Sequence, residues 1–152
     1  MATALGAGLL PIAPGTMGTL AAMPLAYFLR DSFWGARVIF WVTLTLLGIW
    51  SARVFDQTME TQDNQNIVID EVIGLGITSW TAGSDFKTWI AAFVLFRFFD
   101  VLKPFPVRQI DQWSKKRTSR SWDGVGVILD DAVAGFQGLA VILFLQWLRI
   151  LG

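Results

Sequence analysis

The acidic residues of this chain lie beside strongly apolar segments rather than in polar loops, which limits the folds available to it. The five carboxylates concerned are Asp70, Glu71, Asp100, Asp130 and Asp131. A charged group at the centre of a membrane helix costs roughly 2.5–3.5 kcal/mol, so such a group usually has a partner, an ion or a reaction. Arg97 and Lys103 bracket Asp100 in the same way. Carboxylates combined with two bases point to a divalent metal and a phosphate.

The composition is that of a membrane protein. Hydrophobic residues make up 54% of the 152 residues, which is high for a soluble domain of this size. Many of the eight tryptophans lie at segment ends, as in an interfacial aromatic belt, although a tryptophan-rich soluble core is the alternative. The formal net charge is zero, so bulk charge indicates no nucleic-acid partner.

The chain contains no cysteine and no histidine. This excludes disulfides, the usual zinc sites, Ser-His-Asp triads and phosphatases with a cysteine or histidine nucleophile. The chemistry that remains uses carboxylates, amines, guanidiniums, hydroxyls and a bound metal. Oxygen ligands without histidine favour Mg²⁺ over Zn²⁺.

The hydropathy pattern predicts an all-α fold: a small polytopic membrane protein with about five short helices in one domain, residues 1–152. The apolar stretches are 18–29, 38–52, 72–82, 88–102 and 132–148. We expect Ser84-Asp85 to cap the fourth helix and Pro104 to mark its end. Stretch 54–66 is polar and is expected to be a loop or the surface end of a helix, and stretch 105–124 is polar and basic. Pro11 and Pro14 interrupt the first apolar run early, which argues against a signal peptide.

Basic residues in short loops predict the orientation. The stretch 105–124 holds Arg108 and a cluster made of Lys115, Lys116, Arg117 and Arg120, so we expect it to be cytoplasmic. Alternating crossings then place four polar motifs at the cytoplasmic ends of their helices. These motifs are 14–19, 70–71, 100–103 and 130–131.

Each motif taken alone also has a purely structural interpretation. Acidic pairs stabilise helix N-termini, Arg97 and Asp100 can form an intrahelical ion pair, and 14–19 can be a plain turn. In the functional interpretation, Asp100 binds a metal while Arg97 and Lys103 hold a phosphate. Adjacent helical residues point about 100° apart, so both acids of a pair need not face one ligand.

Together these motifs resemble the bacterial phosphatidylglycerophosphatase A family. The segments that carry the resemblance are 11–24, 69–74, 96–108 and 126–135, which together span most of the chain. The resemblance implies a magnesium-dependent lipid phosphatase, multi-pass in the bacterial inner membrane, with its active site facing the cytoplasm. Its substrate would be phosphatidylglycerophosphate, among membrane lipids, and its products phosphatidylglycerol and inorganic phosphate.

The mechanism expected on this basis assigns one role to each group of residues. Asp70, Asp100 and Asp130, helped by Glu71 and Asp131, would bind one or two Mg²⁺ ions. Glu71 is a candidate general base. The candidates for phosphate binding are Arg97, Lys103, Thr16, Thr19 and Arg108. An aspartyl-phosphate intermediate, the oligomeric state and activity on other phosphomonoester lipids stay open.

Three other classes of membrane protein compete with this hypothesis. An ion-coupled transporter also uses intramembrane carboxylates, but would place them near the middle of the membrane. A phospholipid-synthesising phosphotransferase would carry an Asp-Gly-x-x-Ala-Arg pattern. Asp123-Gly124 does not begin such a pattern, because Val-Gly-Val follows it. A structural membrane subunit would not need Asp70, Asp100, Lys103 and Asp130 together.

Overall fold

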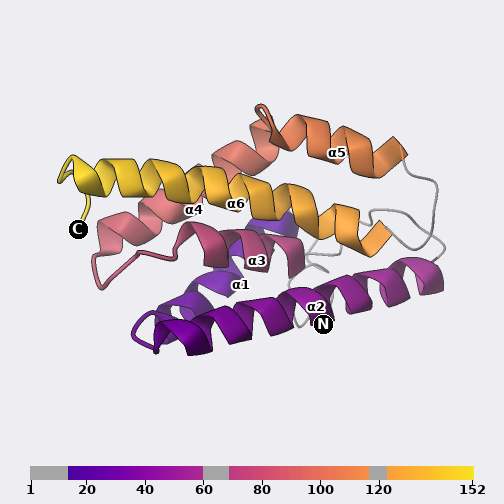
Figure 1. Cartoon of the computed structure of the whole chain (residues 1–152), viewed down its shortest axis with the longest axis horizontal. Coiled ribbons are helices and arrows are strands. Elements are labelled where there is room, and N and C mark those ends of the chain that lie inside the picture. Colours follow the sequence, from indigo (N-terminus) through magenta and orange to yellow (C-terminus); the bar gives the residue numbers. More distant parts are fainter. Residues whose placement is uncertain (1–13, 60–68, 117–122) are drawn as a thin grey trace.

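The computed structural model describes residues 14–59, 69–116 and 123–152, and these ranges form a bundle of six helices (Figure 1). The helices are α1 (Pro14–Leu29), α2 (Trp34–Met59), α3 (Ile69–Thr78), α4 (Phe86–Leu102), α5 (Val107–Lys116) and α6 (Asp123–Trp147). The all-α prediction is confirmed. Arg117 and Arg120 of the basic cluster lie outside the described residues.

Two details differ from the expectation of about five short helices. The polar stretch 105–124 contains a helix, α5, which its low hydropathy concealed. In addition, α2 and α6 are long, with 26 and 25 residues. Helix α2 continues to Met59 because arginine, aspartate and glutamine end an apolar run without ending a helix.

The short helix α3 lies at the centre of the bundle, where seven of its ten residues are buried. It packs most extensively on α6, and Gly74 and Gly135 allow that close approach. A Cβ at Gly135 would lie 2.6 Å from the carbonyl oxygen of Gly74. At the same crossing, the Thr78 hydroxyl donates to the carbonyl oxygen of Gly135 at 3.1 Å. Small residues and an interhelical hydrogen bond are typical of packing between membrane helices.

Local signals at both ends of α4 match the sequence. The Asp85 side chain accepts hydrogen bonds from the backbone amides of Lys87 and Thr88 and so caps the helix N-terminus. The last turn closes at Lys103, whose backbone is left-handed with φ 44° and whose amide donates to the carbonyl oxygen of Phe99. Pro104 then directs the chain away from the helix. This turn holds the Lys103 side chain at the junction of α4 and α5.

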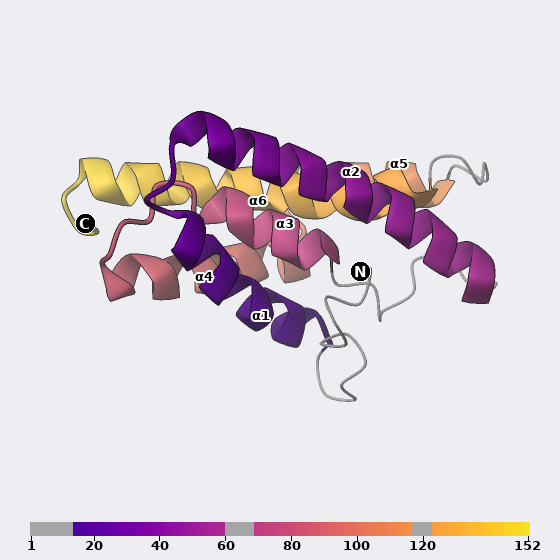
Figure 2. The same ribbon diagram turned by 90° about the horizontal axis from the view of Figure 1, so that it is seen from below.

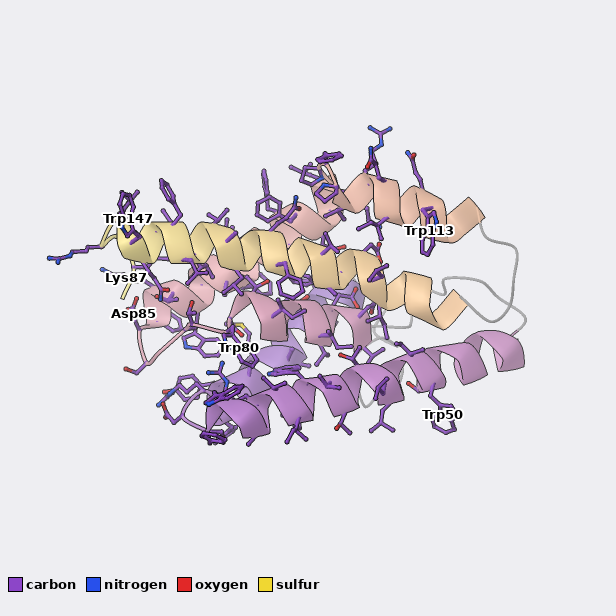
Figure 3. All side chains as sticks on the ribbon, in the orientation of Figure 1. Trp50, Trp80, Asp85, Lys87, Trp113 and Trp147 are labelled. Atoms are coloured by element: carbon purple, nitrogen blue, oxygen red, sulfur yellow. The ribbon has the colours of Figure 1, made fainter. Side chains whose placement is uncertain are left out.

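Among the residues that the structure describes, two stretches are long and apolar enough to cross a membrane: Trp34–Ser51 in α2 and Ile128–Trp147 in α6. Large apolar side chains on their surfaces are exposed, which indicates association with a membrane. Figure 3 places Trp80 and Trp147 toward one end of the long axis and Trp50 and Trp113 toward the other. Trp89, by contrast, is buried and donates its indole N–H to the carbonyl oxygen of Gly83, so it belongs to the core rather than to a belt.

Candidate active site

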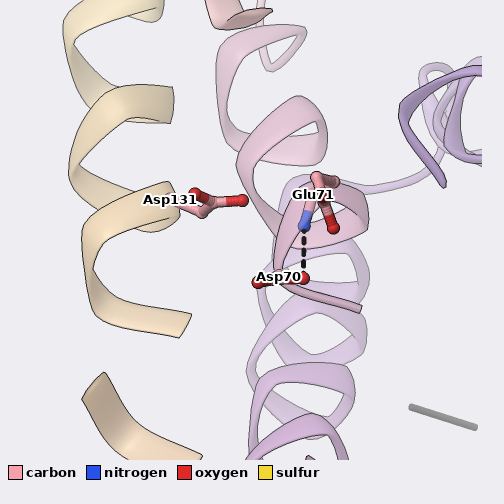
Figure 4. A group of neighbouring side chains, drawn as sticks. All are labelled: Asp70, Glu71 and Asp131. Carbon is pink, nitrogen blue, oxygen red and sulfur yellow. Dashed lines mark hydrogen bonds between the residues drawn. The ribbon is translucent and has the colours of Figure 1, made fainter. Parts of the chain in front are cut away.

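Three carboxylates from two helices form the centre of the candidate site. Asp70 and Glu71 occupy the first turn of α3, and Asp131 points toward them from α6 (Figure 4). One carboxylate oxygen from each lies within 4.8 Å of the others, close enough to hold a metal ion. Asp70 also accepts a hydrogen bond from the backbone amide of Glu71 at 3.1 Å.

The fit of a cation to this cluster rests on an unsatisfied oxygen. Oε2 of Glu71 is buried and accepts no hydrogen bond from the part of the chain that the structure describes. A buried carboxylate oxygen without a donor is costly, and a hard cation would satisfy it. Asp70, Glu71 and Asp131 therefore suit Mg²⁺ in both chemistry and position.

The pKa directions of the α3 acids agree with this excess of negative charge. Burial raises the pKa of Asp70 well above its ordinary value, and the charges of Asp131 and Glu71 raise it further. The pKa of Glu71 is also raised, mainly by burial. A bound cation would reverse these effects by favouring the charged carboxylates.

The α4 residues Arg97 and Asp100 extend the cluster on one side. Nη1 of Arg97 lies 2.6 Å from Oδ2 of Asp100 and 3.9 Å from Oε1 of Glu71. The predicted shared face of Arg97 and Asp100 is confirmed. Asp100 also interacts electrostatically with Asp131 and Glu71, so it completes an acidic group around one guanidinium.

Lys103 and Asp130 form a second polar centre beside the first. Nζ of Lys103 donates to Asp130 on α6 at 2.7 Å and to Asp111 on α5 at 2.6 Å. Burial alone would lower the pKa of Lys103, but its hydrogen bonds to Asp111 and Asp130 and their charges outweigh burial and raise it. The structure thus separates the two adjacent acids of α6: Asp131 faces α3, and Asp130 faces Lys103.

The start of α1 lies directly against this site, and Figure 2 shows α1 and α3 beginning at a similar level along the long axis. A Cβ on Gly15 would overlap Oε1 of Glu71 and lie 3.1 Å from Nη1 of Arg97. Thr16 is half-buried in this first turn. Thr19 is fully buried and donates its hydroxyl to the carbonyl oxygen of Gly15 at 2.8 Å.

Arg108, the remaining predicted phosphate ligand, is exposed on the first turn of α5. None of the hydrogen bonds or ion pairs among residues 14–59, 69–116 and 123–152 joins it to the acidic cluster. Sequence reasoning missed Asp111 and the close approach of Gly15. The spacing of Val107, Ile110 and Asp111 on one helical face could have indicated an amphipathic α5 that brings Asp111 inward.

The fold and the site define a class: a small helical membrane protein with a carboxylate site suited to a metal ion, next to two bases. The family model of phosphatidylglycerophosphatase A matches residues 1–146, and the chain belongs to this family.

Three relatives agree with this assignment in length and identity. Phosphatidylglycerophosphatase A of Escherichia coli is 34% identical over 146 residues, 95% of this chain and 81% of the relative. The Haemophilus influenzae protein of the same name is 36% identical over 150 residues, 97% of this chain and 87% of the relative. A Bacteroides thetaiotaomicron protein, provisionally named a phosphatidylinositol-3-phosphatase, is 34% identical over 155 residues, with 95% of this chain and 91% of the relative covered. No solved structure matches the chain.

Proposed function

We propose that this chain is a magnesium-dependent phosphatase that hydrolyses phosphatidylglycerophosphate to phosphatidylglycerol and inorganic phosphate. The observation that carries the proposal is the meeting of Asp70, Glu71 and Asp131 in a chain of this family. The names of the E. coli and H. influenzae relatives support the substrate. The name of the third relative points to another phosphomonoester lipid, so the lipid headgroup is part of the test.

The level of the site along the bundle favours hydrolysis at a membrane face over transport. Gly48 of α2 packs against Ile69 and Ile128, so the start of α3 lies at the height of Gly48. Gly48 is close to Ser51, where the apolar stretch of α2 ends. An interfacial position suits a lipid phosphate, whereas a cation pathway would need carboxylates near the middle of the membrane.

Asp70, Glu71 and Asp131 would hold the magnesium ion, with Asp100 close by. When bound, magnesium polarises the phosphoryl group and lowers the pKa of an attacking water. Glu71 would accept the proton of that water through whichever carboxylate oxygen does not hold the ion, so it is the candidate general base. Arg97 would neutralise the phosphoryl oxygens as the bond to the glycerol oxygen breaks. Lys103 would add a second positive charge, held in position by Asp111 and Asp130.

The proposed location is the bacterial inner membrane, with the site facing the cytoplasm. The basic residues of 105–124 support this orientation through the preference of cationic loops for the cytoplasmic side. Labelling of single cysteines introduced at exposed positions such as Gln112 and Asp31 in spheroplasts tests it. We expect the Asp31→Cys variant to react with an impermeant maleimide and the Gln112→Cys variant to be protected. The reverse pattern would overturn the orientation.

Phosphate release from defined lipids tests the activity. The purified chain in detergent should release phosphate from phosphatidylglycerophosphate with Mg²⁺ and stop when excess chelator is added. Phosphatidylinositol 3-phosphate and phosphatidic acid, supplied at equal surface concentration, should be hydrolysed more slowly. Faster release from either lipid would assign a different substrate, and no release from any of them would reject the phosphatase.

A further inference from the structure

A cavity of about 340 Å³ lies between α2, α3 and α6, outside the acidic cluster. Its lining includes Val42 and Thr45 of α2, Ile73 and Ile77 of α3, and Phe136 of α6. Val42 and Phe136 are 53% and 60% exposed, so the cavity opens at the surface of the bundle. That surface belongs to the two helices that are long and apolar enough to cross a membrane.

The chemistry of the walls selects an apolar occupant. The lining side chains are aliphatic or aromatic apart from Thr45. The Thr45 hydroxyl donates to the carbonyl oxygen of Trp41 at 2.7 Å, so it is already satisfied within α2. A polar ligand would lose its hydrogen bonds with water and gain few in return.

The cavity lies farther along the same two helices, α3 and α6, that carry the acidic cluster. Asp70, Ile73 and Ile77 are spaced i, i+3 and i+7, so they lie along one face of α3. Ile73 is about 4.5 Å and Ile77 about 10 Å beyond Asp70 along the helix axis. Helix α6 runs parallel to α3, because Gly74 contacts Asp131 and Gly135 while Thr78 contacts Gly138 (Figure 1). Phe136 therefore lies beyond Asp131 in the same direction.

We propose that this cavity holds an acyl chain of the lipid substrate while its terminal phosphate lies at Asp70, Glu71 and Asp131. The inference rests on the proposed function. Along α2 the cavity extends from the level of Gly48 toward Val38, which is into the apolar stretch that would lie in the hydrocarbon of the membrane. A lipid whose phosphate lies at the membrane face directs its acyl chains along this path. The substrate is thus recognised at two places, one charged and one apolar.

Two substrates that share a headgroup distinguish the contribution of the apolar cavity from that of the acidic cluster. Hexanoyl-chain phosphatidylglycerophosphate carries acyl chains, and the deacylated, water-soluble glycerophosphoglycerol phosphate does not. If the cavity positions the lipid, binding energy from the chain contributes to the reaction at the phosphate. The wild type should therefore show a much higher kcat/KM for hexanoyl-chain substrate, used as monomers, than for the deacylated compound. Equal values would overturn the proposal.

Cavity-filling variants with a matched control complete the test. Val42→Trp and Thr45→Trp each place an indole at the lining, whereas Leu46→Trp adds the same bulk at a 63% exposed position outside it. We expect kcat/KM for the hexanoyl-chain substrate to fall roughly tenfold in both filling variants. Their activity on the deacylated substrate, and the activity of Leu46→Trp on both substrates, should be unaffected.

The other outcomes discriminate between the two proposals. Folded filling variants that keep the wild-type kcat/KM, or that lose activity equally on both substrates, would overturn the acyl-chain site. An equal loss of activity in Leu46→Trp would also overturn it. If both filling variants failed to fold, the comparison of the acylated and deacylated substrates on the wild type would decide alone. A wild-type protein that released phosphate from neither substrate would instead reject the proposed function.

Discussion

Lys103 Nζ lies 2.7 Å from Asp130 Oδ2, which joins the C-terminal end of α4 to α6. The same ammonium lies 2.6 Å from Asp111 Oδ1 on α5. One cation thus links three helices at the edge of the candidate site. Asp130 is buried, so the loss of Lys103 would remove a charged hydrogen-bond donor from a buried carboxylate.

Replacing Lys103 by methionine should lower both stability and activity. A hydrogen bond between charged groups contributes about 1.5–3 kcal/mol, so we expect a loss of stability of that order. Thermal unfolding in detergent measures it. The double variant Lys103→Met with Asp130→Asn should recover part of the stability, because the buried charge is removed together with its partner. If the two changes were additive, the pair would not be coupled.

Gly15→Ala should impair catalysis, because its Cβ would overlap Oε1 of Glu71. Glu71 or the start of α1 must then shift, and a misplacement of this kind lowers kcat/KM by roughly tenfold or more. Gly83→Ala is the matched control, since no atom lies within 4 Å of a Cβ there. Steady-state phosphate release measures both variants. Equal activity in the two would show that the approach of Gly15 to Glu71 has no role in the reaction.

The requirement for magnesium should become stronger as the pH falls. Burial and the charges of Asp131 and Glu71 raise the pKa of Asp70 above its ordinary value of 3.8. Protons therefore still compete with the metal for this carboxylate at pH values above 3.8. We therefore expect the Mg²⁺ concentration for half-maximal activity to increase between about pH 8 and about pH 6. A titration of activity against Mg²⁺ at each pH measures this. A constant half-maximal concentration would contradict a raised carboxyl pKa at the metal site.

Metal-free protein should show the converse dependence of stability on pH. An acid whose pKa is raised in the folded state binds more protons when folded, so the free energy of unfolding decreases as the pH rises above about 3.8. Unfolding midpoints in chelator, compared with midpoints in Mg²⁺, measure this contribution. Magnesium should stabilise the protein most at high pH; an equal effect at all pH values would place the ion elsewhere.

Much of this site could be predicted from the sequence, because charge beside apolar helices has few structural explanations. Asp70, Glu71, Asp100 and Asp131 come together, Asp85 caps α4, and the helix ends before Pro104. These features depend on local spacing and on the cost of charge near lipid, and both can be read from a single chain.

The rest depends on tertiary packing. Adjacent side chains on a helix diverge by about 100°, so the sequence could not indicate that Asp131 would face α3 and Asp130 would face Lys103. Helix α5 has too little hydropathy to appear as a membrane segment, so its Asp111 was not expected near Lys103. The approach of Gly15 to Glu71 depends on how α1 crosses α3, which is set by the shape of the packed side chains.

Phosphate release by the Asp131→Asn variant tests the central claim most directly. Asparagine keeps the size of the side chain but removes the charge from the metal site, while Asp85→Asn changes an acid at the capped start of α4. With phosphatidylglycerophosphate and saturating Mg²⁺, we predict that Asp131→Asn loses activity at least about 100-fold while Asp85→Asn retains it. Folded Asp131→Asn protein that released phosphate at the wild-type rate would contradict the account.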